Sequence, residues 1–309
     1  MSVAAAPAPA PADTTRLLAG IGVTMLGVFV FACSNALAKW LTGGYPVGQI
    51  LFARSLVVLC ILACFIRPAD FRAMREGGQP WLHAWRAMLS AVEVVCFYWA
   101  VVHLPLAGST TIYLAGPIYV TAMSAIFLKE QVGWRRWLAV MAGFCGVMVA
   151  LQPSGLSLNI YTVVSVAGSI MYAISLVITR RLRATPTTLL VAVQVVPLLL
   201  MTSASAWPLD PPTSLVGGWI LPGPRDCAIL ALVGVLSMVG YLCINRSLQM
   251  APASVITPFN YASILWATLL GYLVFHEVPT PATLAGAAII IAAGLYIVLR
   301  EHVRGIRRI

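Results

Sequence analysis

Charged residues are scarce in this chain, and their scarcity decides its class. Only 9% of the 309 residues are charged, while 61% are hydrophobic. A soluble domain carries about 25% charged residues, so no soluble fold could hide this much apolar surface. The lipid bilayer must therefore be the solvent for most of the chain. The alternating pattern of a membrane β-barrel is absent too, which leaves helices as the spanning elements.

Motifs for catalysis and for cofactors are also missing. The chain has no His-x-x-x-His pair, no Gly-x-Ser-x-Gly turn and no phosphate-binding Gly-Lys-Ser/Thr loop. Its seven cysteines include no Cys-x-x-Cys pair, and Cys60 and Cys64, one helical turn apart, are interpreted as packing residues. We therefore expect a protein that is not an enzyme, holds no cofactor or metal, and does not couple to ATP.

What the chain does contain is a series of apolar runs of helical length. A spanning helix needs about 20 such residues. The runs predict ten spans, at 17–38, 46–66, 84–103, 107–128, 135–151, 159–179, 187–206, 226–248, 253–275 and 282–299.

The net charge of +10 is distributed unevenly over these spans. With the N-terminus in the cytoplasm, 16 of the 19 lysines and arginines fall on the inner side, Arg86 among them. This is the positive-inside bias, and it predicts that both termini are cytoplasmic. It also explains the basic charge by membrane topology, so we expect membrane lipid and no nucleic acid as a partner. The oligomeric state stays open.

The two halves of the chain are similar to each other. Residues 127–130 read Phe-Leu-Lys-Glu, residues 274–277 read Val-Phe-His-Glu, and their glutamates are 147 residues apart. The same shift aligns Ser90 with Ser237. Each half holds five spans, and a copy of an odd number of spans enters the membrane from the opposite side. The pattern predicts an all-α protein of two inverted five-helix repeats, a construction typical of secondary transporters.

The predicted organisation has four parts. They are a disordered Ala/Pro-rich segment at 1–16, the first repeat at 17–151, the second repeat at 159–299, and a basic cytoplasmic tail at 300–309.

Five-plus-five spans, the apolar-Lys/His-Glu signature and glycines in the short helix after each signature resemble the EamA family of the drug/metabolite transporter superfamily. The resemblance covers about residues 17–299. Ala115 to Ile118 fit the family's fourth-helix pattern with its proline, whereas the matching position of the second half is Ile264. The resemblance implies a cavity between the halves, alternating access, and a bacterial inner-membrane protein that exports amino acids, other metabolites or cationic drugs.

Two charged side chains fall within predicted spans, where charge is costly and commonly functional. Arg54 lies about 12 Å from the outer edge and Glu93 about 13 Å from the inner edge, at 1.5 Å per residue. The two can pair near the middle of the membrane. The pair could simply lock two helices together. Alternatively, Glu93 binds a substrate ammonium or titrates during transport, and Arg54 binds a carboxylate.

Polar and aromatic residues in the spans complete the candidate site. The amides could line the cavity or join helices, and the aromatic rings could bind substrate or face lipid. The further candidates for substrate binding or coupling are Asn35, Tyr98, Tyr113, Tyr172, Gln194, Asn260 and Tyr261. Gly116, Pro117 and Pro258 are hinge candidates, with static kinks as the alternative. Asn245, at the end of a span, is expected at the membrane interface.

The leading functional hypothesis is export of small metabolites by alternating access, most of all of aromatic or apolar amino acids. One positive and one negative charge near the middle of the membrane, among aromatic residues, favour it. Efflux of lipophilic cationic drugs is the alternative, since a carboxylate and rings also bind cations. Exchange of nucleotide-sugars or phosphorylated metabolites comes third, because no Lys/Arg cluster is predicted within the spans.

Overall fold

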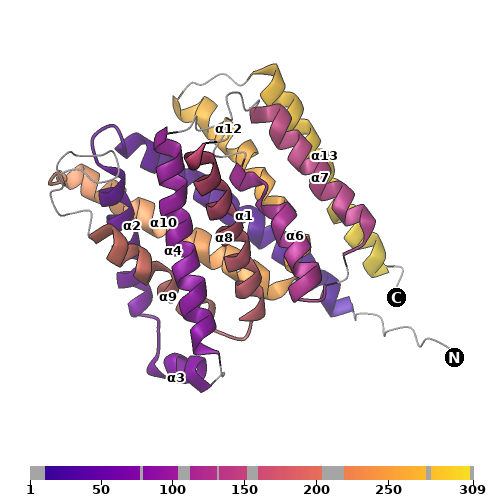
Figure 1. Ribbon diagram of the computed structural model, residues 1–309, viewed down its shortest axis with the longest axis horizontal. Helices are drawn as coiled ribbons and strands as arrows, with labels where there is room; N and C mark the ends of the chain where they lie inside the picture. Colours follow the sequence, from indigo (N-terminus) through magenta and orange to yellow (C-terminus); the bar gives the residue numbers. More distant parts are fainter. Residues whose placement is uncertain are drawn as a thin grey trace.

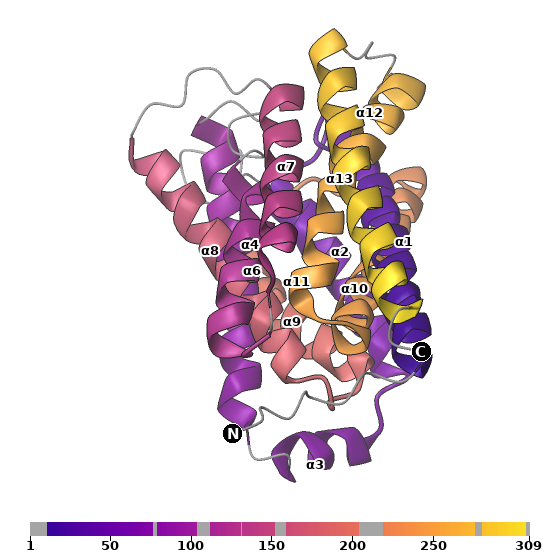
Figure 2. The same cartoon turned by 90° about the vertical axis from the view of Figure 1, so that its right-hand side faces the viewer.

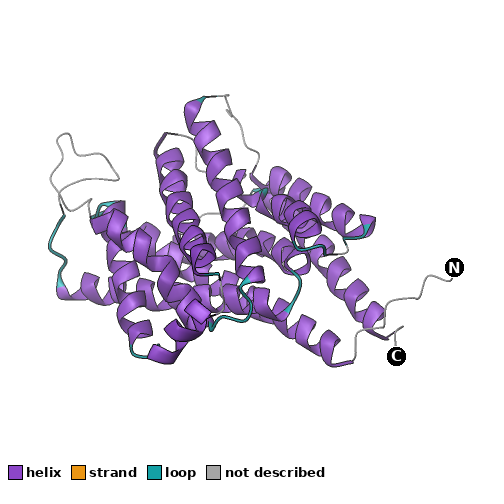
Figure 3. Ribbon diagram, turned by 60° about the horizontal axis from the view of Figure 1, so that its bottom comes forward, coloured by secondary structure: helices purple, strands orange, loops and turns teal. Residues whose placement is uncertain are grey.

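The computed structural model describes residues 11–76, 79–103, 112–130, 132–151, 159–203, 219–275 and 280–306. Within these ranges the chain forms helices and turns and no strand (Figure 3). Among the described residues, four helical stretches are long and apolar enough to cross a bilayer: Thr15–Leu41, Ile160–Arg181, Pro224–Met250 and Ala253–Val274. Shorter apolar helices accompany them at Val47–Ala63, Ile112–Phe127, Thr187–Ser203 and Pro281–Ile297. The protein is thus an all-helical, multi-pass membrane protein.

Each predicted apolar run contains a helix within the described residues. The first half contains α1 (Pro11–Leu41), α2 (Val47–Ala63), α3 (Pro68–Glu76), α4 (Pro80–His103), α6 (Gly116–Phe127) and α7 (Trp134–Leu151). The second contains α8 (Ile160–Arg181), α9 (Thr187–Ser203), α10 (Pro224–Met250), α11 (Ala253–Ile256), η2 (Thr257–Tyr261), α12 (Ala262–Phe275) and α13 (Pro281–Ile306).

The sequence did not predict α3. The first and last helices of the chain also extend beyond the predicted spans. Helix α3 is short and rich in charge, so it carries no apolar run, and it lies across one end of the bundle (Figures 1 and 2). Helix α1 begins at Pro11, inside the segment predicted to be disordered, and α13 continues to Ile306. Residues 1–10 and 307–309 lie outside the described ranges.

Helices of the first half pack on helices of the second half. Helix α1 packs along α10, and α4 packs along α8. Helix α2 contacts α9, and α7 lies beside α13 (Figure 1). The halves are therefore interleaved rather than separate lobes, and a site in the middle of the bundle receives side chains from both.

Small residues allow the α1–α10 and α4–α8 pairs to approach closely. A Cβ at Gly27 of α1 would lie 2.8 Å from the Cβ of Cys243 on α10. A Cβ at Gly168 of α8 would lie 2.9 Å from the Cβ of Cys96 on α4. Either distance is too short for two carbon atoms, so both positions require glycine. Small residues at contacts between membrane helices commonly serve this purpose.

A buried pair of serines joins each of the same two helix pairs. Ser34 of α1 and Ser237 of α10 lie 2.8 Å apart, oxygen to oxygen. Ser90 of α4 and Ser175 of α8 lie 2.7 Å apart. Ser34 Oγ also lies 3.2 Å from the Val233 carbonyl, so hydrogen bonds between the helices satisfy these hydroxyl groups away from water.

Candidate functional site

Arg54 lies on α2 and is 9% exposed. Its Nη2 donates a hydrogen bond to the hydroxyl of Tyr241 on α10. Its guanidinium carbon also lies 5.2 Å from the centre of the Tyr241 ring and 5.9 Å from that of Phe31 on α1. The two rings meet edge to face, with their centres 4.9 Å apart. Arg54 is therefore held against the rings of Phe31 and Tyr241, where cation–π attraction adds to the hydrogen bond.

Glu93 lies on α4, close enough to Arg54 for the two charges to attract each other. The backbone carbonyl of Glu93 accepts a hydrogen bond of 2.9 Å from the Tyr113 hydroxyl. The Tyr113 ring packs edge to face on Phe97, one turn after Glu93, with ring centres 4.9 Å apart. A Cβ at Gly168 would collide with the Tyr113 hydroxyl, so that glycine makes room for the ring. The electrostatic interaction of Glu93 with Arg54 agrees with the predicted proximity of the two side chains, and their direct pairing stays a prediction.

Tyr172 of α8 completes the group, because its hydroxyl interacts electrostatically with both Glu93 and Tyr241. Its ring lies against Gly116, at the start of α6. We define the central cluster as Phe31, Arg54, Glu93, Tyr113, Tyr172 and Tyr241. Its members come from both halves of the chain. They offer one positive charge, one negative charge and four rings, which suits a small molecule with opposite charges and an apolar part.

Gln194 belongs to a different group of polar residues, built around Arg86. Arg86 is 1% exposed and donates to Thr179 Oγ1 at 2.6 Å, to the Leu190 carbonyl at 2.9 Å and to Gln194 Oε1 at 2.7 Å. It also donates to Asn245 Oδ1, so one side chain of α4 ties together α8, α9 and α10.

The sequence placed Arg86 on the inner side of the membrane and Asn245 at the membrane interface, and the structure shows that both side chains are buried within the bundle. Four acceptors surround the Arg86 guanidinium, which removes most of the cost of burying it. Asn245 is 5% exposed, and its own amide donates to the Tyr241 carbonyl at 2.8 Å. The Arg86 group therefore adjoins the central cluster through the backbone of Tyr241.

The other predicted site residues lie outside the central cluster. Asn35 is exposed on α1, one turn beyond Phe31 on the same side of the helix. Tyr261 is 2% exposed and packs on Gly143 of α7, and Asn260 beside it is half-buried in η2. Tyr98 belongs to α4, but its side chain lies outside the described part of the structure.

The predicted hinge residues occupy breaks in the helices. Gly116 and Pro117 begin α6 directly after a turn at Ala115. Pro258 lies in η2, a 3₁₀ segment that separates α11 from α12. Proline removes a backbone donor, which accounts for both breaks. Whether they move remains a prediction.

The Lys-Glu signature at 129–130 has a structural role at the α3 end of the bundle. Lys129 has a φ of 53°, a left-handed backbone that ends α6 and turns the chain back. Glu130 then accepts hydrogen bonds from the N–H groups of Ala253 and Ser254, at 3.1 and 3.2 Å, and from Ser254 Oγ at 2.6 Å. Arg180 of α8 lies 3.8 Å from the same carboxylate. The signature thus joins the first half to the start of α11.

A model of the EamA-like transporter family matches residues 18–152 and 159–300. The chain belongs to this family. The predicted resemblance is therefore confirmed, and the drug/metabolite transporter type with it. Each half of this EamA protein matches the model separately.

Named relatives support the family membership over nearly the full length. The chain is 27% identical to a pseudopaline exporter of Pseudomonas aeruginosa, over 90% of this chain and 95% of the relative. It is 26% identical to a riboflavin transporter of Rhizobium johnstonii, over 94% of each. It is 22% identical to an S-adenosylmethionine uptake transporter of Rickettsia bellii, over 91% and 94%. One solved crystal structure shares the fold, with a TM-score of 0.72 and 16% identity over 92% of this chain and 98% of the other.

Tyr241 and Phe31 of the central cluster, and the neighbouring Arg86, were not among the predicted site residues. Tyr241 lies in a predicted span, but a tyrosine there is equally typical of a lipid-facing belt. The repeat shift of 147 places Tyr241 at the position of Val94, beside Glu93, and that signal could have singled it out.

Proposed function

We propose that this EamA-family protein is a secondary transporter that exports small zwitterionic metabolites, most of all aromatic or apolar amino acids. Ten membrane helices form two inverted five-helix repeats around the central cluster, and alternating access opens that cluster to either side. The protein lies in a bacterial cytoplasmic membrane with both termini in the cytoplasm. Its relatives are bacterial transporters of small molecules, which supports the location and the kind of cargo.

Equivalent contacts in the two halves support the inverted repeats. Ser34 and Ser175 are 141 residues apart, and so are Gly27 and Gly168. Their partners Ser90 and Ser237, like Cys96 and Cys243, are 147 residues apart. The serine contact and the glycine contact of the α1–α10 pair therefore recur in the α8–α4 pair, as a pseudo-two-fold relation between halves requires.

The central cluster carries the proposal about the substrate. Arg54 and Glu93 attract each other in the middle of the bundle. Rings from α1, α4, α8 and α10 and that of Tyr113, shortly before α6, lie near them. An amino acid presents a carboxylate to Arg54, an ammonium to Glu93 and a side chain to the rings. Opposite charges aligned in this way orient a zwitterion and discriminate against a simple cation or anion.

Efflux of lipophilic cations is the second candidate. The observation that favours it is the number of rings near one carboxylate, which is an arrangement that binds quaternary ammonium groups. On this alternative Arg54 would serve as a structural partner of Glu93. Phosphorylated substrates fit less well, since the guanidinium of Arg86 is already surrounded by four acceptors.

The decisive experiment measures flux in proteoliposomes that contain the purified protein. Labelled phenylalanine is followed while amino acids, quaternary cations and nucleotide-sugars compete. We expect saturable flux that amino acids alone inhibit. Competition by cations without amino-acid flux would contradict the proposal and favour drug efflux. Some relatives are named as exporters and others as uptake transporters. The direction of transport is therefore tested by imposing the substrate gradient from each side of the membrane in turn.

The substitution Glu93→Gln tests the role of the carboxylate. It keeps the size of the side chain and removes the charge, so we expect the flux to fall by about tenfold or more, because a charge-assisted hydrogen bond contributes about 1.5–3 kcal/mol. Thermal stability in detergent should stay close to that of the wild type. Asp70→Asn, on α3, is the matched control and should transport normally. Normal flux with normal pH dependence in Glu93→Gln would remove Glu93 from the site.

A further inference from the structure

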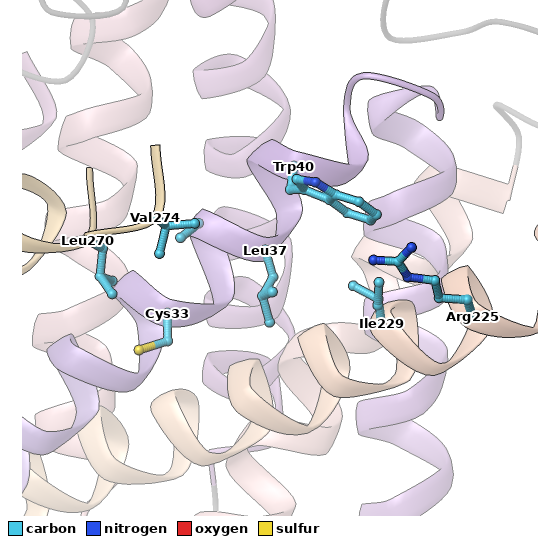
Figure 4. Close-up of a pocket in the computed structure, with 8 residues that line it drawn as sticks. Cys33, Leu37, Trp40, Arg225, Ile229, Leu270 and Val274 are labelled. Atoms are coloured by element: carbon cyan, nitrogen blue, oxygen red, sulfur yellow. The ribbon is translucent and has the colours of Figure 1, made fainter. Parts of the chain in front are cut away.

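A groove of about 430 Å³ opens on the surface of the bundle between α1, α10 and α12, away from the central cluster (Figure 4). Almost all of its lining is apolar. Cys33, Leu37 and Trp40 line it from α1, Ile229 from α10, and Leu270 and Val274 from α12. From Cys33 to Trp40 the groove follows α1 for about 10 Å, at 1.5 Å per residue.

Among the residues that the structure describes, Arg225 is the one charged side chain that lines this groove, and it lies at the end where α10 begins. Its guanidinium carbon is 5.5 Å from the centre of the Trp40 ring, and Figure 4 shows the group beneath that ring. No hydrogen bond or ion pair connects Arg225 to another residue in the ranges that the structure describes. The arginine therefore presents its N–H groups at one end of the apolar groove.

The neighbouring carboxylate does not cancel this charge by direct contact. Asp226 accepts a hydrogen bond of 2.6 Å from the Tyr45 hydroxyl, in the turn between α1 and α2. This hydrogen bond raises the pKa of Tyr45 above its ordinary value, which shows that the carboxylate acts on the tyrosine. Asp226 is thus engaged by Tyr45, while Arg225 lies against Trp40.

We propose that this groove binds an anionic phospholipid, with an acyl chain along Leu37 and Leu270 and the headgroup phosphate at Arg225. A membrane surrounds the groove with lipid, and the single arginine at its end selects among lipids by charge. Tryptophan is enriched at the level of the headgroups, which places the Trp40–Arg225 end where a phosphate lies. Arginine binds phosphate oxygens with two parallel N–H donors. A free phosphate has no acyl chain, so the apolar groove would add nothing to its affinity.

Native mass spectrometry of the purified full-length protein tests this proposal. The detergent-solubilised protein is titrated with phosphatidylglycerol or with phosphatidylcholine of identical acyl chains. We expect the wild type to retain phosphatidylglycerol in preference, and Arg225→Gln to retain about fivefold less of it, as for one basic residue at an anionic surface. Arg183→Gln, which removes an exposed arginine from the turn after α8, is the matched control and should behave as the wild type.

A second variant separates the acyl chain from the phosphate. Leu37→Trp fills the groove and keeps Arg225, so it should also lose phosphatidylglycerol. Equal retention of the two lipids by the wild type, or unchanged retention by both Arg225→Gln and Leu37→Trp, would overturn the proposal. So would displacement of the lipid by millimolar glycerol phosphate, which would assign the site to a free phosphate. Loss of a dimer instead of a lipid in Leu37→Trp would assign the groove to a second copy of the chain.

Discussion

At the scale of single residues, Tyr241 holds Arg54 in two ways. Its hydroxyl accepts a hydrogen bond from the guanidinium, and its ring lies 5.2 Å from the guanidinium carbon. Phe31 supports both groups from α1, and Gly240 leaves space for the Phe31 ring, which a Cβ would meet at 2.6 Å. The direction in which Arg54 points is therefore set by α10 and α1 and not by α2 alone.

Tyr241→Phe separates the hydroxyl from the ring. The variant loses the hydrogen bond and keeps the cation–π contact, so we expect the half-saturation concentration for a carboxylate substrate to rise by about tenfold. The maximal flux should change little. Tyr241→Leu should raise the half-saturation concentration further, since it also loses the cation–π attraction of about 0.5–2 kcal/mol. Tyr272→Phe, at an exposed position on α12, controls for the general effect of losing a hydroxyl. An unchanged half-saturation concentration in Tyr241→Phe would show that Arg54 does not bind the substrate carboxylate.

At the residue scale, the sequence singles out residues whose charge is conspicuous in an apolar run. Arg54 and Glu93 are charges inside apolar runs, and their cost singled them out. Arg86 was assigned to the inner side of the membrane because it lies near the end of a run, and its four acceptors come from helices distant in sequence. Only the tertiary structure assembles such a group.

At the scale of elements, hydropathy predicted the helices well, because a spanning segment must satisfy its own backbone hydrogen bonds. It could not predict the break between α11, η2 and α12, since the whole run is apolar and Pro258 alone does not fix where the helix tightens. It also gave no reason for the Lys-Glu signature, whose glutamate acts on a segment more than a hundred residues away.

The left-handed residue before Glu130 yields a prediction about stability. A side chain in the left-handed region costs about 1–2 kcal/mol, and glycine avoids most of this cost. We expect Lys129→Gly to stabilise the protein by up to about 1 kcal/mol, measured as a higher unfolding temperature in detergent. Lys129→Ala removes the same charge but keeps the Cβ, so it should give no gain. Equal effects of the two substitutions would mean that charge, and not backbone strain, governs this position.

At the scale of the whole molecule, the interleaving of the halves restricts how the protein can open. The α1–α10 pair is in close contact at Gly27 and again at Ser34, and the α4–α8 pair is in close contact at Gly168 and again at Ser175. Separating the two helices of either pair would leave buried hydroxyl groups without their hydrogen-bond partners. The central cluster, by contrast, is formed between the two pairs and α2, through the Arg54–Tyr241 hydrogen bond and the electrostatic interactions of Glu93 with Arg54 and Tyr172. Relative movement of intact helix pairs is therefore the least costly way to expose it.

Disulfide cross-linking distinguishes this movement from separation within a pair. In a variant whose native cysteines are replaced and which still transports, Ser34 and Ser237 are changed to cysteine, and in a second variant Ser90 and Ser175 are changed. If each helix pair moves as one body, oxidation should leave the flux within about twofold of the reduced protein in both variants, since a covalent bond inside a rigid body blocks no hinge or shear motion between bodies. Loss of flux that a reductant restores would show that the cross-linked pair itself must part. If flux is lost in only one variant, separation of that helix pair exposes the central cluster to one side of the membrane. The two halves would then be equivalent in architecture but not in movement.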